Sequence, residues 1–179
     1  MNWIKIRERI AFDGFRKVIQ KTFQLPNGKT ATFDTINGGS FVTIAAFTKE
    51  KEAILVRQYR PGAEKLLVSF PEGGIEGSEN PIATAIRELE EETGYRAKKI
   101  IHLKTFRWAY RVDMQICFLA IDCEKVGEQQ LDDTEFIEII TLPLEKFKTL
   151  LTNSADESFN NVDAGFLALH YFNNNEEKV

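Results

Sequence analysis

Glutamates and an arginine are concentrated in residues 73–95, which read GGIEGSENPIATAIRELEEETGY. The members whose spacing matters most are Glu79, Arg87, Glu88, Glu91 and Glu92. Carboxylate oxygens are the ligands that hard divalent cations prefer, and such cations bind beside negatively charged groups such as phosphates. This stretch therefore indicates a divalent-cation site that handles an anionic substrate.

The same stretch predicts a helix with clear boundaries. Asn80 followed by Pro81 is typical of a helix N-cap and first turn, and Gly94 is typical of a left-handed helix end. Apolar residues recur between these boundaries with the helical period, and we expect the stripe that they form to face the core. The stripe consists of Ile82, Ala85, Ile86 and Leu89.

Three glutamates share one flank of this predicted helix. At roughly 100° per residue, Glu88, Glu91 and Glu92 fall close together beside the apolar stripe. Like charges at these spacings repel and cost a helix a few tenths of a kcal/mol per pair. We call these three residues the acidic ridge, and we expect bound cations to offset their repulsion.

A solvated, charged helix face without a site is the alternative, because runs of charge usually have that role. The loop before the helix argues against it, since a proline and several glycines there form a turn whose backbone can approach a ligand. These residues are Pro71, Gly73, Gly74 and Gly77. At average residue frequencies, the fixed residue types of this stretch recur at their spacing by chance about once in ten million positions.

The stretch resembles the signature of the Nudix hydrolases, G-x5-E-x7-R-E-U-x-E-E-x-G-U with U apolar, and every fixed position matches. The resemblance implies that the acidic ridge binds Mg²⁺ or Mn²⁺, with a backbone carbonyl of Glu72 or Gly73 as a further ligand. It also implies that Glu79 and Arg87 brace the loop against the helix, and that Gly73 and Gly94 are structural. The implied reaction is hydrolysis of a nucleoside diphosphate linked to another group.

A second candidate site precedes the signature, where Arg57, Tyr59 and Arg60 end a hydrophobic strand. Guanidinium groups bind phosphate bidentately, and a tyrosine ring can stack on a base. An edge strand with exposed polar residues is the alternative. The string RQYR is similar to a segment of the ADP-ribose pyrophosphatase branch of the family, as is the N-terminal β unit. In that branch the extra strands pair two subunits, so the resemblance implies a homodimer.

The loop after the signature departs from that branch. Members that prefer ADP-ribose carry Ser-Pro-Gly and an acidic residue there, whereas this chain has Trp108 at the proline position and Asp113 at the acidic one. Trp108, Tyr110 and Arg111 could stack on a base and bind phosphate or sugar. A strand-to-strand turn with an aromatic ring in the core is the alternative.

The general base is open in the sequence, because loop geometry decides it. One set of candidates belongs to the acidic ridge, at Glu91 and Glu92. Another belongs to the later loops, where Asp113 is the first candidate and Asp133 or Glu135, in the segment LDDTEF, is the second.

Length and composition fit a small enzyme. The chain has 179 residues, 43% hydrophobic and 28% charged, so a single domain with a core is expected. A net charge of −4 disfavours nucleic acid as a partner. Cys117 and Cys123 are predicted to be buried and reduced. The sequence shows no apolar run typical of a signal peptide or a membrane span, so we expect a cytoplasmic protein without a membrane partner.

Patterning predicts an N-terminal β unit, residues 1–38, followed by a Nudix hydrolase domain, residues 39–179. Strands are expected at 3–11, 16–24, 29–36, 41–47, 53–58, 98–107, 115–122 and 136–141. Further helices are expected from Pro143 to about 151 and from 162 to 171. A Pro-Asn-Gly turn should join the second and third strands. The pattern suits an α/β (α+β) fold with a mixed sheet between helices, like the α/β/α sandwich that the resemblance implies.

The functional expectation is metal-dependent hydrolysis of a nucleoside diphosphate sugar, either ADP-ribose-like or a GDP-, ADP- or UDP-sugar, to a nucleoside monophosphate and a sugar phosphate. Dinucleoside polyphosphates are the alternative substrates. A non-catalytic nucleotide-sensing domain is the alternative outside the enzymes. Such a domain should have lost carboxylates of the signature or gained a DNA-binding helix pair, and the sequence shows neither.

Overall fold

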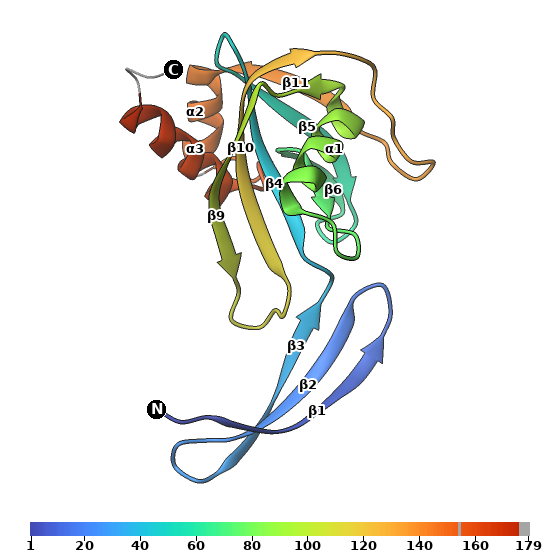
Figure 1. Ribbon diagram of the computed structural model, residues 1–179, viewed down its shortest axis with the longest axis vertical. Coiled ribbons are helices and arrows are strands. Elements are labelled where there is room, and N and C mark those ends of the chain that lie inside the picture. The colour runs from blue at the N-terminus through green and yellow to red at the C-terminus, as the bar shows by residue number, and fades with distance from the viewer. Residues whose placement is uncertain (154, 176–179) are drawn as a thin grey trace. The chain divides into compact units, whose positions relative to one another are not determined.

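The computed structural model describes residues 1–153 and 155–175 (Figure 1). The chain divides into two compact units. The first unit consists of Met1–Ser40 with Thr105–Gln115, and the second of Phe41–Lys104 with Ile116–Val179. The segment at 105–115 therefore belongs with the N-terminal strands, although the sequence pattern grouped it with the domain that follows them. Among the described residues, no helix has the length and apolar character to cross a membrane.

An antiparallel three-stranded sheet, in the order β1-β2-β3, forms most of the first unit. Its strands are β1 (Ile4–Asp13), β2 (Lys17–Gln24) and β3 (Thr30–Asn37). The predicted Pro-Asn-Gly turn is confirmed, because Gly28 has a φ of +81° and Gln24 pairs with Thr30 across the turn. Residues 105–115 add to this unit through Ile36, which exchanges backbone hydrogen bonds of 2.9 and 3.0 Å with Tyr110 and Val112.

The second unit is built on an eight-stranded sheet whose main path is β11-β5-β4-β10-β8, with β6 on β5, β7 on β4 and β9 on β10. Its strands are β4 (Phe41–Thr48), β5 (Glu52–Arg60), β6 (Lys65–Ser69), β7 (Glu72–Gly74), β8 (Tyr95–Arg96), β9 (Lys99–Arg107), β10 (Met114–Lys125) and β11 (Glu138–Pro143). Every predicted strand is present. The strands β6, β7 and β8 were not predicted, because runs of five, three and two residues are too short for an alternating pattern to be recognised.

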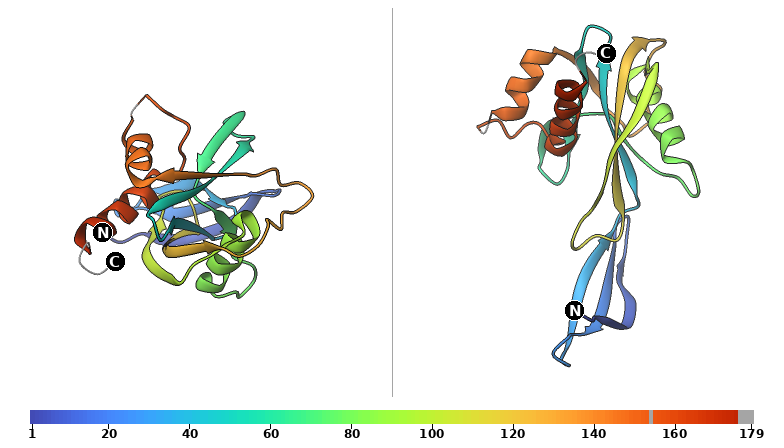
Figure 2. Two further views of the ribbon diagram at one scale, coloured as in Figure 1. Left: turned by 90° about the horizontal axis from the view of Figure 1, so that it is seen from above. Right: turned by 60° about the vertical axis from the view of Figure 1, so that its left-hand side comes forward.

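Helices cover both faces of this sheet, as Figure 2 shows. Helix α1 (Pro81–Thr93) lies on one face, and α2 (Leu144–Thr152) and α3 (Val162–Asn174) lie on the other. The predicted α/β/α sandwich is therefore confirmed. Five phenylalanines fill the core on the side of α2 and α3, and their contacting rings have centroids 4.9–5.9 Å apart. They are Phe47, Phe70, Phe147, Phe159 and Phe172.

The prediction for the cysteines is also confirmed. Cys117 and Cys123, both in β10, are buried thiols that form no disulfide. Burial raises the pKa of the Cys123 thiol to about 12, so this thiol stays protonated and unreactive at neutral pH.

Candidate active site

Helix α1 begins and ends where the sequence predicted. The Asn80 side-chain oxygen accepts a hydrogen bond from the Ile82 N–H at 2.9 Å, which satisfies one of the free donors at the helix start. Gly94 ends the helix in the left-handed conformation, at a φ of +71°, and donates its N–H to the Glu90 carbonyl at 2.8 Å. A Cβ on Gly94 would also lie 2.3 Å from the Gly127 carbonyl oxygen, so both space and conformation require glycine.

The predicted apolar stripe of α1 is only half correct. Ala85 and Leu89 are fully buried, but Ile82 and Ile86 are 47% and 45% exposed. The buried face instead includes Thr84, Glu92 and Thr93. Compared with the predicted orientation, the helix is rotated about its axis, so the Glu92 side chain points into the interior. There its carboxylate accepts a hydrogen bond from a backbone N–H of β7. An apolar pattern could not indicate this, because it assumes that a glutamate faces solvent.

Glu92 is the most buried member of the acidic ridge, with 5% of its surface exposed. One carboxylate oxygen accepts the Glu72 N–H at 3.1 Å. Burial raises the pKa of the Glu92 carboxyl to about 8, the Glu72 N–H opposes that rise, and the charges of Glu88, Glu72 and Glu135 add to it. Burial likewise raises the pKa of Glu88, against the Arg87 guanidinium, and Glu91 and Glu135 add to that rise. Burial and neighbouring carboxylates therefore raise the pKa of both groups, although the Arg87 guanidinium lies beside Glu88.

Gly73 and Arg87 shape the outer side of the ridge. A Cβ on Gly73 would lie 1.7 Å from the Glu88 carboxyl carbon, so strand β7, rather than the predicted turn, passes directly against this side chain. Arg87 donates to both carboxylate oxygens of Glu79, at 3.3 and 3.2 Å, and to the Gly74 carbonyl at 3.4 Å. Its Nη1 also lies 2.8 Å from an oxygen of Glu88 and of Glu91. The loop and the helix are thus tied together by one guanidinium.

The donor set of the ridge fits a hard divalent cation. Three carboxylates from one helix supply oxygen ligands with little positive charge among them, apart from Arg87. Within the described ranges, no three acidic, histidine or cysteine side chains converge as a complete ligand set. Arg87 accounts for this, because it engages Glu88 and Glu91. If those two carboxylates bound an ion, Arg87 would still have Glu79 and the Gly74 carbonyl as partners.

Glu72, at the start of β7, lies in a polar network beneath the ridge. One carboxylate oxygen accepts hydrogen bonds from the Thr43 hydroxyl at 3.0 Å and from the Asn161 amide at 2.7 Å. The other lies 3.1 Å from an Arg60 nitrogen. Burial raises the pKa of the Glu72 carboxyl, and Arg60, Thr43 and Asn161 oppose that rise. The side chain of Glu72 is therefore engaged within the protein, and its backbone carbonyl is the group that could meet an ion.

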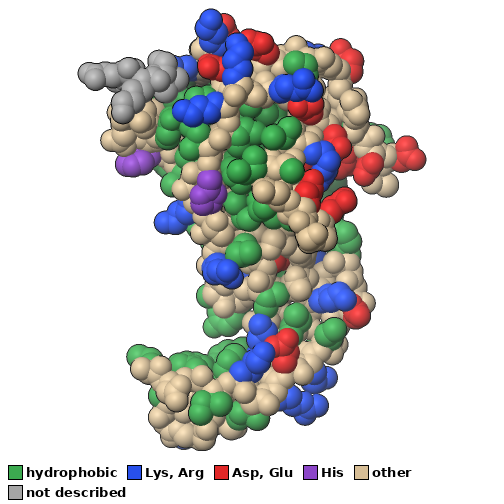
Figure 3. Space-filling model, viewed as in Figure 1, with side chains coloured by type: hydrophobic (Ala, Val, Ile, Leu, Met, Phe, Trp, Pro, Cys, Tyr) green, Lys and Arg blue, Asp and Glu red, His purple; other side chains and the backbone are tan. Residues whose placement is uncertain are grey.

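A long loop between β10 and β11, residues 126–137, covers the end of α1 and approaches the ridge. The Val126 N–H donates to the Gly94 carbonyl and the Gln130 N–H to the Glu91 carbonyl, each at 2.8 Å. The Gln129 amide donates to the Glu92 carbonyl at 2.7 Å. The loop thus satisfies carbonyl groups that a helix end leaves free. Acidic side chains gather over α1 and this loop in Figure 3.

This loop carries two of the predicted acids. Glu135 is exposed, and its charge contributes to the raised pKa of both Glu88 and Glu92. The structure therefore brings Glu135 into electrostatic contact with the ridge. Asp133 is exposed in the same loop but does not figure among the charges that shift these carboxyl groups.

The predicted residues before the signature divide between two faces of β5. Arg57 donates from Nε to Glu138, its cross-strand neighbour on β11, at 3.0 Å. Tyr59, two residues on, is 56% exposed. Arg60 faces the interior of the site and pairs with Glu72. Arg57 and Tyr59 are thus available at the surface, whereas Arg60 belongs to the network beneath the ridge.

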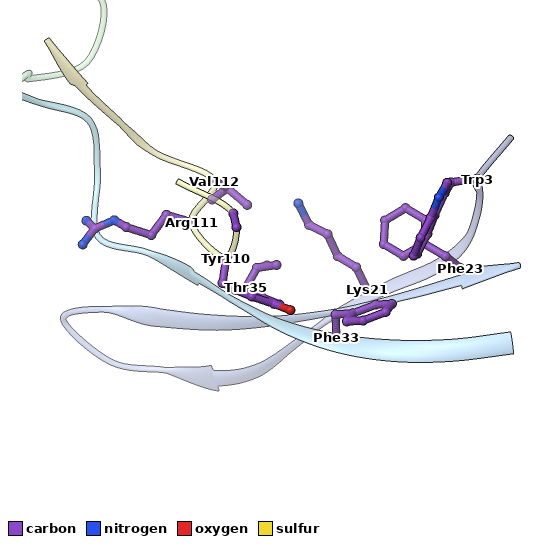
Figure 4. A pocket seen from close by; sticks show the side chains of 9 residues that line it. Trp3, Lys21, Phe23, Phe33, Thr35, Tyr110, Arg111 and Val112 are labelled. Carbon is purple, nitrogen blue, oxygen red and sulfur yellow. The ribbon is translucent and has the colours of Figure 1, made fainter. Parts of the chain in front are cut away.

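The predicted residues after the signature belong to the first unit. Trp108 stacks on Phe106, with ring centroids 5.8 Å apart, and Trp108 and Tyr110 are 46% and 61% exposed. Tyr110 lines an apolar hollow of about 380 Å³ beside the three-stranded sheet. The hollow is also lined by Trp3, Lys21, Phe23, Phe33, Thr35 and residues 109, 111 and 112. Figure 4 shows the Arg111 guanidinium pointing away from the aromatic end of this hollow.

Asp113 is engaged within the first unit. Its side chain is 1% exposed, and its two oxygens accept hydrogen bonds from Arg111 at 2.7 and 2.8 Å. The Gly38 N–H adds a third, at 2.7 Å. Burial acts to raise the pKa of Asp113, but Arg111 and the Gly38 N–H outweigh it and hold this pKa below its ordinary value.

Sequence reasoning missed the residues that support the ridge from elsewhere in the chain. Thr43, Gln129 and Asn161 all bond to Glu72 or Glu92. The only sequence signal was an asparagine directly before the predicted last helix, and that position is typical of an ordinary helix cap.

Comparisons with known proteins agree on one family. A model of the NUDIX domain matches residues 39–162. The ADP-ribose pyrophosphatase of Bacillus subtilis (strain 168) is 37% identical over 125 residues, which cover 68% of this chain and 68% of that protein. The methanol dehydrogenase activator of Bacillus methanolicus is 35% identical over 126 residues, covering 69% of this chain and 68% of the relative.

A solved structure has the same fold. The crystal structure of an ADP compounds hydrolase superposes with a TM-score of 0.84 and 23% sequence identity, covering 100% of this chain and 98% of the other.

Proposed function

The chain belongs to the Nudix family of hydrolases, and from that premise we propose that it cleaves the diphosphate linkage of a nucleoside diphosphate sugar. The products would be a nucleoside monophosphate and a sugar phosphate. The observation that supports the proposal is the acidic ridge, where Glu92 is 5% exposed and accepts the Glu72 N–H, and Glu88 lies against the neighbouring Gly73. ADP-ribose is the first substrate to test, because a relative with 37% identity is an ADP-ribose pyrophosphatase.

The proposed role of the ridge is to hold one or more divalent cations. When bound, Mg²⁺ or Mn²⁺ would neutralise charge on the diphosphate and act as a Lewis acid. Glu88, Glu91 and Glu92 would supply the carboxylate ligands, and the backbone carbonyl of Glu72 or Gly73 a further one. Arg87 would keep the loop and the helix in register through its ion pair with Glu79.

Among the later acids, we assign the general base to Glu135 rather than to Asp113. Glu135 is exposed to solvent and acts electrostatically on Glu88 and Glu92. Asp113 is 1% exposed, and Arg111 and the Gly38 N–H occupy both of its oxygens. A base must reach the attacking water with a free lone pair, and Glu135 meets that requirement better. We therefore assign Asp113 a structural role in the first unit.

Arg57 and Tyr59 are the proposed substrate contacts on β5. The Tyr59 ring is exposed and can stack on a base, and Arg57 can exchange its exposed partner Glu138 for a phosphate. An exposed ion pair of this kind is worth only about 0–1 kcal/mol, so the exchange costs little. In the first unit, we propose Trp108 and Tyr110 as further stacking groups on the grounds of their exposure.

We also propose that the protein is a homodimer formed through the first unit. Strand β1 is exposed along its whole length. Its apolar side chains include Ile4, Ile6, Ile10 and Phe12, each more than half exposed. Exposed apolar strands of this kind are unstable as free edges and favour pairing with another chain. Sedimentation of the purified protein would test this, because a monomer at micromolar concentration would contradict it.

A panel of substrates tests the proposed function. Purified protein with Mg²⁺ would be given ADP-ribose, ADP-glucose, GDP-mannose, UDP-glucose and dinucleoside polyphosphates, and the products would be separated by chromatography. We expect cleavage of one or more of the nucleotide sugars. Cleavage of the polyphosphates alone would move the substrate class to the alternative. Failure with every compound would favour the non-catalytic, nucleotide-sensing alternative.

A further inference from the structure

We propose that Asn161, the residue before α3, is a positioning residue for the acidic ridge. Its side chain binds the segment whose backbone N–H donates to Glu92. The start of α3 is therefore linked to the proposed metal site through hydrogen bonds. The inference rests on the proposed function only in taking the ridge as that site. The residues involved all belong to the second unit.

Both the oxygen and the nitrogen of the Asn161 side-chain amide form hydrogen bonds. The residue is 3% exposed. Its oxygen accepts the Phe70 N–H at 2.8 Å, and its nitrogen donates to a Glu72 carboxylate oxygen at 2.7 Å. A backbone N–H can only donate and a carboxylate can only accept, so the position demands one acceptor and one donor on a short planar group. Among the natural side chains of this length, only asparagine supplies both.

Asn161 does not serve its own helix. Asparagine is among the strongest N-cap residues, and losing a cap typically costs about 0.5–2 kcal/mol. Asn161 occupies the N-cap position of α3, yet its side chain makes no capping hydrogen bond. The side chain is directed to Phe70 and Glu72 instead. The helix therefore lacks a stabilising cap at this position, because the side chain binds residues near the ridge instead. Such a loss of local stability is expected where a residue serves function.

The chain before α3 delivers Asn161 to this position. The Val68 N–H of β6 donates to the Ser158 carbonyl at 2.8 Å, and the Asn160 N–H donates back to the Val68 carbonyl at 2.9 Å. Phe159, between them, is buried against the rings of Phe70 and Phe147. The two hydrogen bonds and the aromatic contacts of Phe159 fix the backbone directly before Asn161.

Through Glu72, the constraint reaches the ridge. Asn161 binds the backbone of Phe70 and the side chain of Glu72, and so fixes a three-residue turn at both ends. The N–H of Glu72 donates to Glu92 at 3.1 Å, and the next residue, Gly73, lies against Glu88. A shift of this turn would therefore move the backbone donor and the steric support of two ridge carboxylates at once.

The variant Asn161→Asp tests this coupling. It keeps the acceptor for Phe70 but removes the donor and sets a second carboxylate against Glu72. The matched control is Asn160→Asp, which adds the same charge on the exposed neighbouring side chain. We expect N161D to raise the Kd for Mn²⁺, measured by electron paramagnetic resonance of the free ion, and to lower kcat, each by about 10-fold or more. KM should change less than kcat, and N160D should behave as the wild type.

The double variant N161D/E72Q tests whether the hydrogen bond itself matters. The introduced glutamine amide can donate to the introduced aspartate, which restores the hydrogen bond between positions 72 and 161 with its direction reversed, and the Thr43 hydroxyl can turn to accept the second amide hydrogen. We expect the Kd for Mn²⁺ and kcat to return to within about threefold of the wild type, as coupling between contacting residues predicts. If Asn161 only stabilised the fold, N161D would lower the Tm in EDTA, but Mn²⁺ binding would not weaken in N161D and recover in the double variant.

The outcomes separate the two proposals. Equal Mn²⁺ binding and kcat in N161D and N160D would overturn the positioning role, as would a double variant no better than N161D. If N161D does not fold, the double variant N161D/E72Q alone tests the positioning role. Weak Mn²⁺ binding by the folded double variant would then overturn the inference. A wild-type chain that binds Mn²⁺ but cleaves no compound of the panel refutes the proposed hydrolysis, and the Kd for Mn²⁺ then tests the positioning role by itself. One that does not bind Mn²⁺ refutes the metal site itself.

Discussion

Gly73 lies so close to Glu88 that a Cβ on the glycine would lie 1.7 Å from the carboxyl carbon. This contact sets how closely strand β7 approaches the acidic ridge. It is a requirement of space, because the glycines with a positive φ in the described part of the chain are those at 28, 39, 77 and 94. The absence of a side chain at Gly73 therefore lets the backbone and the carboxylate meet at the same place.

The substitution Gly73→Ala should move Glu88 without unfolding the protein. The clash is with the end of a flexible side chain, which can turn away, so we expect a small change in Tm. The displaced carboxylate should lower kcat by about 10- to 100-fold. The matched control is Gly74→Ala in the same strand, where a Cβ meets no atom within 4 Å. Equal activity of the two variants would contradict the role given to this contact.

Replacing Glu92 by glutamine should abolish metal-dependent turnover while the fold persists. The glutamine oxygen can still accept the Glu72 N–H, and the neutral amide resembles the protonated carboxyl that a pKa of about 8 implies. We expect kcat to fall by at least about 100-fold, since a charged ligand is lost. Glu90→Gln, on the same helix but paired with Arg96, is the control. Near-normal hydrolysis by E92Q would remove Glu92 from the metal site.

The raised pKa of Glu92 also predicts how the metal-free protein responds to pH. A carboxyl whose pKa rises on folding, here from 4.5 to about 8, stabilises the fold fully below pH 4.5. That stability is lost as the pH rises through 8. In EDTA, the free energy of unfolding should therefore fall by on the order of 3 kcal/mol between pH 5 and pH 8.5.

The variant E92Q isolates this effect, because it removes the titrating group and leaves all others. Urea unfolding of both proteins across this pH range would measure it, and the curve of E92Q should be the flatter one. Adding Mg²⁺ at pH 8 should stabilise the wild type more than E92Q, since the ion compensates the buried charge. Parallel curves for the two proteins would contradict the assignment.

The two ends of helix α1 could be predicted from the sequence, but the burial of Glu92 and the partners that surround it could not. Asn80 and Gly94 each act through their own backbone neighbourhood, so local chemistry located them. The orientation of α1 was mispredicted, because Glu92 is buried by a backbone donor on β7, which lies 20 residues away in the chain. Asn161 was missed because a local pattern explains it as a helix cap, while its real partners are 89 and 91 residues away.

Replacing Asp113 by asparagine should destabilise the first unit. The variant leaves the Arg111 guanidinium without its counter-charge, and breaking a buried pair costs about 3–5 kcal/mol, somewhat less here because Arg111 is partly exposed. Both tryptophans, Trp3 and Trp108, lie in this unit, so tryptophan fluorescence during urea unfolding would report the loss. The control is Asp34→Asn, at an exposed position of β3. A stable D113N that has lost turnover would return Asp113 to the role of base.

Replacing Glu135 by glutamine should have the opposite result. Glu135 is exposed, so we expect the free energy of unfolding to stay within about 0.5 kcal/mol of the wild type. If this carboxylate takes the proton from water, kcat should fall by about 10²- to 10⁴-fold. Asp133→Asn, in the same exposed loop, provides the control. An E135Q variant with near-normal kcat would place the base within the ridge, at Glu91 or Glu92.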